Sequence, residues 1–454
     1  MSPVIRSPDA VRWIVRRLED SGFETWAVGG AVRDALAEHP TEDWDFATAA
    51  RPADVRRLFR RTVPVGIEHG TVGVLAADGH MYEVTTFRRD VATDGRHARV
   101  EFADTVDEDL ARRDFTINAL AWHPFRDEVL DPFQGQDDLR AGRLRTVGDP
   151  ATRFAEDYLR VLRAVRFAGR FELRIEEDTW RALCDATPHL GRLSAERIRE
   201  ELLKTLGSCV RSSGALALLH GSGAVETLIP ELDQADPGAL ELALPATDLV
   251  SANRPLVRLA VWMSAMGGAG GAGGAGGAGG AGRAHAVAGT GAVERAGVVA
   301  GAAGAILERL RFSRAEIATV VGIVRGMNLG MADPDDPVAM RRWCSAVGRD
   351  QVRLVLGALL ARERVRAWQE GHELDPLVHF ARACRAALGS GVPLSVQELS
   401  VDGRALIRAG LKPGPRFGEI LDALLDAVLV DPARDDPQGL IALALNLAEA
   451  DSGD

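Results

Sequence analysis

The chain has 454 residues, of which 46% are hydrophobic and 26% are charged, and its formal net charge is −11 at pH 7. This length predicts roughly two to four domains, and the composition is that of a soluble globular protein. No run of about 18 apolar residues is present, which excludes a membrane-spanning helix, and the charged N-terminal stretch excludes a secretory signal. The acidic balance argues against a nucleic-acid partner unless basic residues are gathered locally, and arginines do cluster at 112–113 and 160–170.

The cysteines give a first indication of the compartment. Cys184, Cys209, Cys344 and Cys384 are far apart in the sequence and form no C-x-x-C pair. This spacing favours buried thiols over a disulfide framework or a zinc site. We therefore expect a protein of the reducing cytoplasm.

Residues 24–147 mix short strand-like and helix-like stretches. The order is WAVGG, VRDALAEH, DWDFAT and VRRLFRR, after which HGTVGVLAAD and MYEVTTF flank a turn signal at Asp78 and Gly79. Such a mixture predicts an α/β or α+β domain in this part of the chain.

From Ala151 onward the apolar spacing becomes that of helices. The stretches AEDYLRVLRAVRFAGRF, IREELLKTLG and ALALLHGSGAVETL fit this spacing, and strand signals are sparse from there to the C-terminus. Ser313 and Glu316 predict a capping box at the start of SRAEIATVVGIVRG. The remainder of the chain is therefore expected to be mainly helical, in two or three subdomains.

One segment differs from its surroundings in composition. Residues 267–282 consist of five GGA triplets followed by a glycine. Glycine at every third position is a feature of collagen, but this run is short and contains no proline. A flexible, disordered insertion is the better interpretation.

Asp43 and Asp45 form the sharpest chemical feature of the sequence. On a strand, residues two apart point to the same face, so both carboxylates would project together while Trp44 and Phe46 pack on the opposite side. Paired carboxylates suit Mg²⁺, and a two-metal arrangement activates an attacking hydroxyl and stabilises a leaving pyrophosphate. Taken alone, a D-x-D pattern is more often two surface acids in a turn.

The surroundings of this pair strengthen the metal interpretation. Gly29 and Gly30 lie between strand-like WAV and helix-like VRDAL, where glycine lets backbone N–H groups approach a phosphate, and Arg33 follows one turn later. An ordinary helix N-terminus is the alternative, and the fingerprint G-x-G-x-x-G is absent. Glu83 in MYEVTTF is either a third metal carboxylate or a solvated strand residue. A phosphate loop beside paired carboxylates indicates phosphoryl or nucleotidyl transfer.

The stretch GGAVRDALAEHPTEDWDFAT resembles the first signature of class II tRNA nucleotidyltransferases, the bacterial CCA-adding enzymes and their poly(A) polymerase relatives. The resemblance continues through RRDFTINALAW, through the stretch from DPFQGQDDLR to VRFAGRF, and through LSAERIREELLKTL. It is strong over residues 24–207 and returns faintly at VDGRALIRAGLKPGPRFGEIL. Several motifs in a fixed order are far more specific than any one of them.

This resemblance implies an architecture. It consists of an α+β catalytic head of the polymerase-β nucleotidyltransferase type, with a small mixed sheet plus helices, followed by an all-α neck, body and tail. We accordingly expect the head at 1–150, a base-recognising neck at 151–215, a body at 216–370 with the insertion at 267–282, and a tRNA-binding tail at 371–454. The insertion is not part of the family pattern and should be dispensable for the chemistry.

The resemblance also implies roles for single residues. Asp43 and Asp45 would bind the metal, and the nucleotide would be bound in part by the glycine turn and Arg33. Glu83 joins the two aspartates as a catalytic candidate on its strand position alone, without support from the resemblance. The further nucleotide-binding candidates that it implies are Arg113, Asp114, Asp157, Arg160, Arg163 and Arg166. The implied cofactor is Mg²⁺, and the implied partners are tRNA, CTP and ATP. The lack of a long apolar run predicts that no membrane is among the partners.

A physical argument supports base recognition by Asp157 and Arg160. Three positions apart on the expected helix, they would share a face. A carboxylate only accepts hydrogen bonds and a guanidinium only donates them, which matches the edges of cytosine and adenine. Uracil and guanine would leave buried groups unpaired, at about 1–3 kcal/mol each. The alternative is an exposed intrahelical ion pair, worth only about 0.3–0.5 kcal/mol.

Two residues of the RRD motif have less specific expected roles. Asp114 would accept a hydrogen bond from a ribose hydroxyl and so favour ribonucleotides. Arg113 would either meet a phosphate or orient Asp157, and the sequence leaves both options open.

Full CCA addition has several alternatives. An A-adding or CC-adding enzyme and a poly(A) polymerase would share the chemistry. In this family residues 88–109 correspond to a flexible loop that is shortened in CC-adding enzymes, and its nearly full length here favours a complete or an A-adding enzyme. A catalytically inactive RNA-binding protein is disfavoured by the intact Asp43 and Asp45. A nucleotidyltransferase that modifies a protein is disfavoured by the long helical half.

Overall fold

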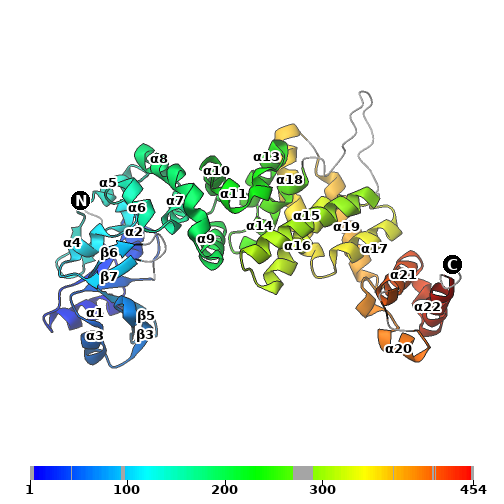
Figure 1. Cartoon of the computed structure of the whole chain (residues 1–454), viewed down its shortest axis with the longest axis horizontal. Helices are drawn as coiled ribbons and strands as arrows, with labels where there is room; N and C mark the ends of the chain where they lie inside the picture. Colours follow the sequence, from blue (N-terminus) through cyan, green and yellow to red (C-terminus); the bar gives the residue numbers. More distant parts are fainter. Residues whose placement is uncertain are drawn as a thin grey trace. The chain divides into compact units, whose positions relative to one another are not determined.

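The computed structural model of the chain describes residues 5–41, 43–93, 98–268, 290–371, 373–411, 414 and 416–450. The chain divides into two compact units, one of Met1–Cys209 with Gly214–Leu228 and one of Val210–Ser213 with Ile229–Asp454. Within the described ranges the strands belong to the first unit, and the regular elements of the second are helices (Figure 1). The expected α+β head followed by helical parts is therefore confirmed. From residue 269 on, the glycine-alanine insertion lies outside the described residues.

The first unit is built on a seven-stranded mixed sheet with the order β3-β4-β5-β2-β1-β8-β9. Its strands are β1 (Thr25–Val28), β2 (Asp45–Thr48), β3 (Thr62–Gly66), β4 (Thr71–Leu75), β5 (Met81–Thr86), β8 (Ala121–His123) and β9 (Glu128–Leu130). β2 and β5 pair in parallel, and the other neighbouring strands pair antiparallel. All four residues of β1 are buried, as befits a strand covered on both faces.

Helices cover parts of both faces of this sheet. The helices of the first unit are α1 (Asp9–Glu19), α2 (Gly30–Leu36), α3 (Pro52–Leu58), α4 (Val106–Ala111), α5 (Gly135–Arg140), α6 (Pro150–Glu156), α7 (Leu159–Phe171), α8 (Glu177–Ala186), α9 (Ala195–Ser208), α10 (Ser212–Gly221, shared with the second unit) and α11 (Ala224–Leu228). α1 buries Val11, Ile14, Val15 and Leu18, whose spacing forms one apolar helix face. This face joins the core that contains Trp44 and Phe46 of the D-W-D-F motif.

Two further strand pairs lie beside the main sheet. β6 (Arg88–Thr93) and β7 (Ala98–Phe102) form an antiparallel hairpin, and β10 (Arg143–Leu144) pairs in parallel with β11 (Arg174–Ile175). The hairpin occupies the segment that was expected to be a flexible loop. Its two strands pair from Arg88↔Phe102 to Thr93↔Ala98. This pairing gives the backbone N–H and C=O groups of the segment hydrogen-bond partners that an open loop would have to find in water.

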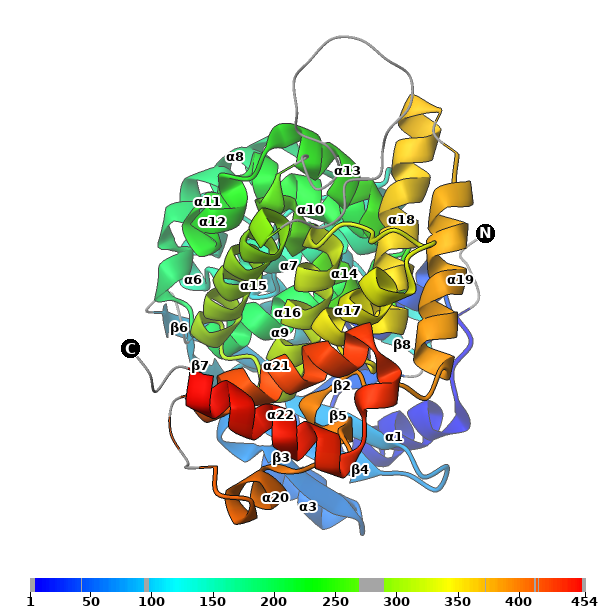
Figure 2. The ribbon, with the colours of Figure 1, turned by 90° about the vertical axis from the view of Figure 1, so that its right-hand side faces the viewer.

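The second unit consists of α12 (Pro230–Asp233), α13 (Pro237–Asp248), α14 (Pro255–Met263), η4 (Ser264–Gly267), α15 (Thr290–Arg309), α16 (Arg314–Asn328), α17 (Pro337–Val347), α18 (Val352–Glu370), α19 (Asp375–Gly389), α20 (Gly403–Arg408), α21 (Arg416–Val430) and α22 (Pro437–Ala450), with short 3₁₀ turns between some of them. The predicted capping box is confirmed, since Ser313 and Glu316 bond reciprocally at the start of α16. α21 and α22 lie side by side (Figure 2) and share a small core with α20 and the segments that flank it, from Val392 to Leu411.

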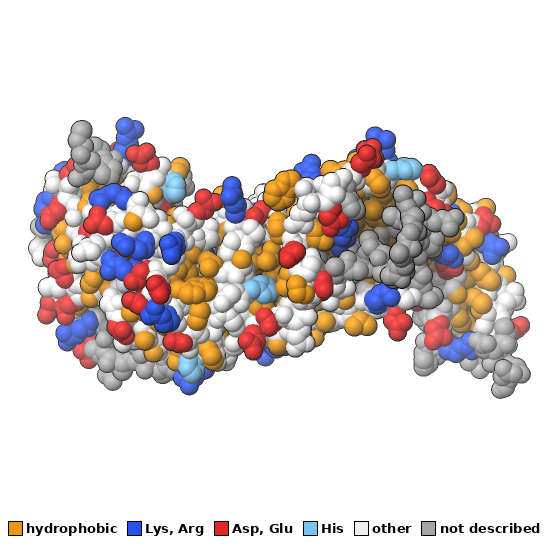
Figure 3. All heavy atoms as spheres, turned by 90° about the horizontal axis from the view of Figure 1, so that it is seen from above, with side chains coloured by type: hydrophobic (Ala, Val, Ile, Leu, Met, Phe, Trp, Pro, Cys, Tyr) orange, Lys and Arg blue, Asp and Glu red, His pale blue; other side chains and the backbone are white. Residues whose placement is uncertain are grey.

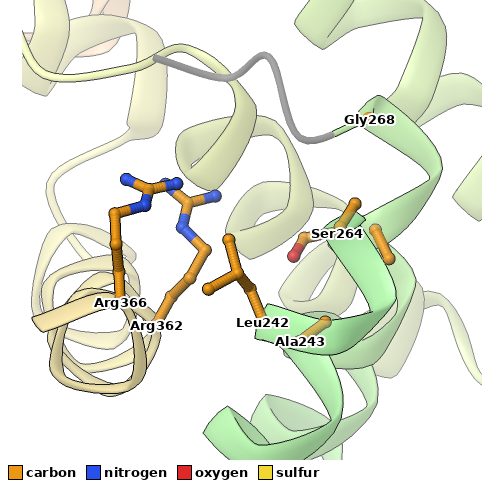
Figure 4. A pocket seen from close by; sticks show the side chains of 8 residues that line it. Leu242, Ala243, Ser264, Gly268, Arg362 and Arg366 are labelled. Carbon is orange, nitrogen blue, oxygen red and sulfur yellow. The ribbon is translucent and has the colours of Figure 1, made fainter. Parts of the chain in front are cut away.

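A cavity of about 20 Å³ lies between α13, η4 and α18 of the second unit. The guanidinium groups of Arg362 and Arg366 lie together on one side of it, and Ser264 lies on the other (Figure 4). Such a volume holds a water molecule but no nucleotide.

The state of the cysteines, the lengths of the apolar helices and the surface charge can be compared with what the composition predicted. All four cysteines are free thiols. No described helix is both long enough and apolar enough to cross a bilayer. On the face shown in Figure 3, basic and acidic side chains are interspersed and form no continuous basic belt.

Candidate active site

The two aspartates of the D-W-D-F motif lie at the start of β2. Side-chain burial alternates as expected, with Asp43 and Asp45 exposed and Trp44 and Phe46 buried. The strand itself begins only at Asp45, so Asp43 lies just before it. The alternation of exposed and buried side chains that is typical of a strand therefore begins before the first hydrogen-bonded residue of β2.

Glu83 comes next to Asp45 through strand pairing. In the parallel register of β2 and β5, Asp45 pairs with Glu83, which places both side chains on one face of the sheet. Burial within the pocket, and then the charges of Glu83 and Asp43, raise the pKa of Asp45 to about 6 against the opposing effect of Arg113. Asp45 keeps an exposed surface, but the protein atoms packed around it reduce its hydration and so penalise its charge. The carboxylates therefore carry a negative charge that their surroundings do not fully compensate.

The glycine turn between β1 and α2 is required by backbone conformation and by space. Gly29 has φ +74°, and a Cβ at this position would lie 2.6 Å from Nη1 of Arg113. Only glycine meets both conditions. Gly30 is the first residue of α2, so the turn brings the start of this helix beside the RRD motif.

Arg33 is buried in the wall of the same site. Its guanidinium forms an ion pair with Asp34 at 2.6 Å, donates to the side-chain oxygen of Asn118 and stacks on the ring of Phe171 at 4.3 Å. Burial lowers its pKa, and the charge of Asp34 opposes this effect. Arg33 is thus a fixed cation at the pocket surface and not a mobile side chain.

The RRD motif forms a network of charges. The Asp114 carboxylate accepts from Nε of Arg163 at 2.8 Å, from Nδ2 of Asn118 at 3.0 Å and from the N–H of Phe115 at 2.9 Å. Burial alone would raise the pKa of Asp114, but the Arg163 charge and these hydrogen bonds lower it to about 2. Arg113 donates to Asp109 and to the Asn118 carbonyl. These bonds attach the motif to α7, to α4 and to Asn118, which itself accepts from Arg33 of α2.

The long helix expected through Asp157 is interrupted, so the prediction that Asp157 and Arg160 share one helix was wrong. α6 ends at Glu156 and α7 begins at Leu159, with Asp157 extended at φ −154°. The Asp157 carboxylate breaks the helix because it accepts the backbone N–H of Leu159 at 3.0 Å and Nη2 of Arg197 at 2.7 Å. Arg160 bonds instead to Glu156 and to the carbonyl of Arg153.

A pocket of about 590 Å³ brings most of the predicted site residues together. It lies wholly within the first unit. The predicted residues that line it are Gly29, Gly30, Arg33, Asp45, Glu83, Arg113, Asp114, Asp157, Arg160, Arg163 and Arg166. Asp43 does not line it and lies beside it, two residues before Asp45. This volume is suitable for a nucleotide-sized ligand.

The pocket also contains residues that sequence reasoning passed over. Asn118 connects Arg33 and Asp114, and Arg197 holds Asp157. Arg88 and Arg112 extend the basic wall. The only signal for Asn118 and Arg197 was their position within FTINALAW and LSAERIREELLKTL, two of the matched motifs.

Family models match two regions of the chain. The Poly A polymerase head domain matches residues 25–145, which contain the sheet and the carboxylates. The probable RNA and SrmB-binding site of polymerase A matches residues 172–236.

Individual relatives support the same assignment. The CCA-adding enzyme of Streptococcus gordonii is 47% identical over 221 residues, 48% of this chain and 54% of that enzyme, so the chain spans about half the length of such relatives. That of Limosilactobacillus fermentum is 31% identical over 445 residues, 97% of this chain and 98% of that enzyme.

Solved structures extend the likeness to three dimensions. The crystal structure of the Bacillus stearothermophilus CCA-adding enzyme in complex with CTP has a TM-score of 0.69 at 27% identity and covers 98% of this chain and 99% of that one. The Thermotoga maritima CCA-adding enzyme complexed with tRNA, at 19% identity and a TM-score of 0.59, covers 98% of this chain and 97% of that one and shares the fold. With a relative matched along nearly its whole length and the head-domain model over the pocket-bearing sheet, the chain belongs to the CCA-adding enzymes, the class II tRNA nucleotidyltransferases.

Proposed function

We propose that this chain adds C, C and A to the 3′ end of tRNA from CTP and ATP, without a nucleic-acid template. In each step the RNA 3′-hydroxyl attacks the α-phosphate of the nucleotide, a new phosphodiester bond forms, and pyrophosphate leaves. The proposal places this reaction in the cytoplasm, where four free thiols persist. Two relatives named for this activity support it, one 47% identical over about half of this chain and one 31% identical over nearly all of it.

The charge of the pocket is the observation that carries the proposal. Among the described residues, nine arginines and five carboxylates line it, although the whole chain has a net charge of −11. A surplus of guanidinium groups in a concave site is suited to a triphosphate, because each group can bond two phosphate oxygens. The acidic balance of the chain therefore does not oppose a nucleotide or RNA partner.

Asp43 and Asp45, with Glu83, are the residues that we propose to hold Mg²⁺. The described ranges contain no group of three or more His, Cys, Asp or Glu side chains already arranged around a metal position. Mg²⁺ usually needs only one or two carboxylates, with waters and substrate phosphates completing its shell. The raised pKa of Asp45 fits this role, since a cation would neutralise the repulsion from Glu83. When bound, the ion would activate the attacking hydroxyl and stabilise the leaving pyrophosphate.

Base selection is proposed to lie with Asp157 and Arg160. Each carboxylate oxygen of Asp157 accepts one bond from the protein, from Leu159 and Arg197, and each has a second lone pair left for the amino group of cytosine or adenine. Uracil and guanine present a carbonyl there, so two acceptors would face each other. Arg197 acts as a positioning residue that fixes the direction of this carboxylate.

One incubation separates the proposed activity from its alternatives. Purified chain is mixed with tRNA that ends at the discriminator base, CTP, ATP and Mg²⁺, and the products are sized and sequenced. Three added residues, C, C and A, support the proposal. A single A, two C residues, a long A tail or no extension would identify the A-adding, CC-adding, poly(A) polymerase or inactive alternative.

Two variants test the residue roles in the same assay. Asp45→Ala should abolish addition while circular dichroism shows an intact fold, and retained turnover would reject the metal assignment. Asp157→Ala should raise misincorporation of UTP and GTP before it stops the chemistry. Unchanged discrimination by this variant would reject its role in base selection.

A further inference from the structure

One part of the sheet face beside the carboxylates is apolar and open to solvent. Across β3, β4, β5 and β2, the paired residues form one row, Val63–Gly73–Glu83–Asp45. Paired residues on neighbouring strands point to the same face, so Val63 lies on the face of the carboxylates. We call Val63, Val65 and Met81 the aliphatic shelf. It continues the pocket floor away from the arginine-lined side.

The shelf is exposed, although its residue types are normally buried. Val63, Val65 and Met81 are 44%, 42% and 48% exposed. A Cβ on Gly73 would lie 2.8 Å from Sδ of Met81 and 2.9 Å from Cγ2 of Val65, so these two side chains meet above Gly73. The opposite face of the same strands is buried in the core through residues such as Val72 and Tyr82. The core therefore explains why the opposite face is apolar, but it does not explain the apolar residues of the shelf, which are exposed.

A basic side chain, that of Arg61, borders the shelf. Arg61 is exposed, lies two residues before Val63 and so points to the same face, and its carbonyl accepts the N–H of Leu75 at 3.0 Å. An apolar surface next to an arginine suits a nucleotide, whose base and sugar are covered by apolar contacts and whose phosphate bonds to a guanidinium.

The chemistry requires an occupant at this place. Attack at a phosphate runs in line, so the attacking hydroxyl and the leaving pyrophosphate lie on opposite sides of the reacting phosphorus. With the triphosphate on the arginine-lined side, the attacking strand approaches from the other side of the carboxylates. That side is the shelf.

We propose that the shelf, together with Arg61, docks the 3′-terminal nucleotide of the RNA that receives the new residue. This inference rests on the proposed function. A second copy of the chain added to the edge strand β3 is disfavoured, because Pro64 in this strand has no N–H to donate.

The shelf is tested with Val65→Asp and the milder Met81→Gln in the full chain. The control is Val298→Asp on α15, an exposed valine (69%) in the second unit. We expect the KM for tRNA that ends at the discriminator base to rise about tenfold in both shelf variants, through lost apolar contact. CTP binding, measured by calorimetry without RNA, should be unchanged, as should all parameters of the control.

Two further measurements connect the shelf to the RNA end. A 4-thiouridine at the 3′-terminal position of the RNA should crosslink to peptides that contain Val65 or Met81. Arg61→Gln should reduce the slope of log KM against log salt by about 0.7, the value for one lost phosphate contact on a single strand.

The outcomes separate this inference from the proposed function. An unchanged KM for RNA in both shelf variants, or crosslinks confined to other peptides, would overturn the shelf while CCA addition by the wild type stands. Wild-type chain that binds CTP but extends no RNA would overturn both.

Discussion

The Asp114–Arg163 contact allows a prediction whose size follows from the structure. Asp114 is 8% exposed and its pKa falls from 3.8 to about 2 on folding. This shift means that folding favours the ionised carboxylate by about 2–3 kcal/mol. Asp114→Asn keeps the shape but removes the charge, so we expect the free energy of unfolding at pH 7 to fall by about 2 kcal/mol. Urea denaturation followed by tryptophan fluorescence measures this change.

The sign of the pH dependence is fixed by the direction of the shift. Because the folded-state pKa is the lower one, the stabilisation is complete above the unfolded value of 3.8 and is lost as the pH falls towards 2. The difference between wild type and Asp114→Asn should therefore be constant from pH 8 to about pH 5 and shrink below pH 4. The matched control is Asp149→Asn, an exposed N-cap of α6 at which asparagine caps equally well. Equal effects of the two substitutions at pH 7, or a gap that grows on acidification, would refute the reasoning.

Three other changes test the site and its supports. Gly29→Ala forces a Cβ into a backbone with φ +74°, so we expect a loss of at least about 1 kcal/mol in unfolding free energy and a higher KM for CTP, and unchanged values would contradict the turn assignment. Glu201→Ala leaves the buried Arg166 without its partner and should cost about 3–5 kcal/mol in urea unfolding, whereas the exposed Glu200→Ala should change little. Deletion of residues 269–282 should leave the rate of CCA addition near normal, and a large loss would assign the insertion a role in turnover.

The local features of the site could be predicted from the sequence because they depend on neighbours within a few residues. The two-residue period of a strand is enough to put Asp43 and Asp45 on the side opposite Trp44 and Phe46. A capping box likewise needs only positions three apart, as Ser313 showed. Ordered motifs then identified the family without any structure.

Partners that are distant in sequence were decided only by the tertiary structure. Glu83 became a neighbour of Asp45 through the parallel register of β2 and β5, which no periodicity within either strand specifies. Asp157 lies outside its expected helix, and its carboxylate accepts from an arginine 40 residues further along as well as from the nearby Leu159 N–H. The tertiary structure also gathers arginines from distant parts of the sequence into one pocket, although the chain as a whole is acidic. Side-chain pattern fixes what a residue can bond to, whereas the path of the chain fixes which partner comes within reach.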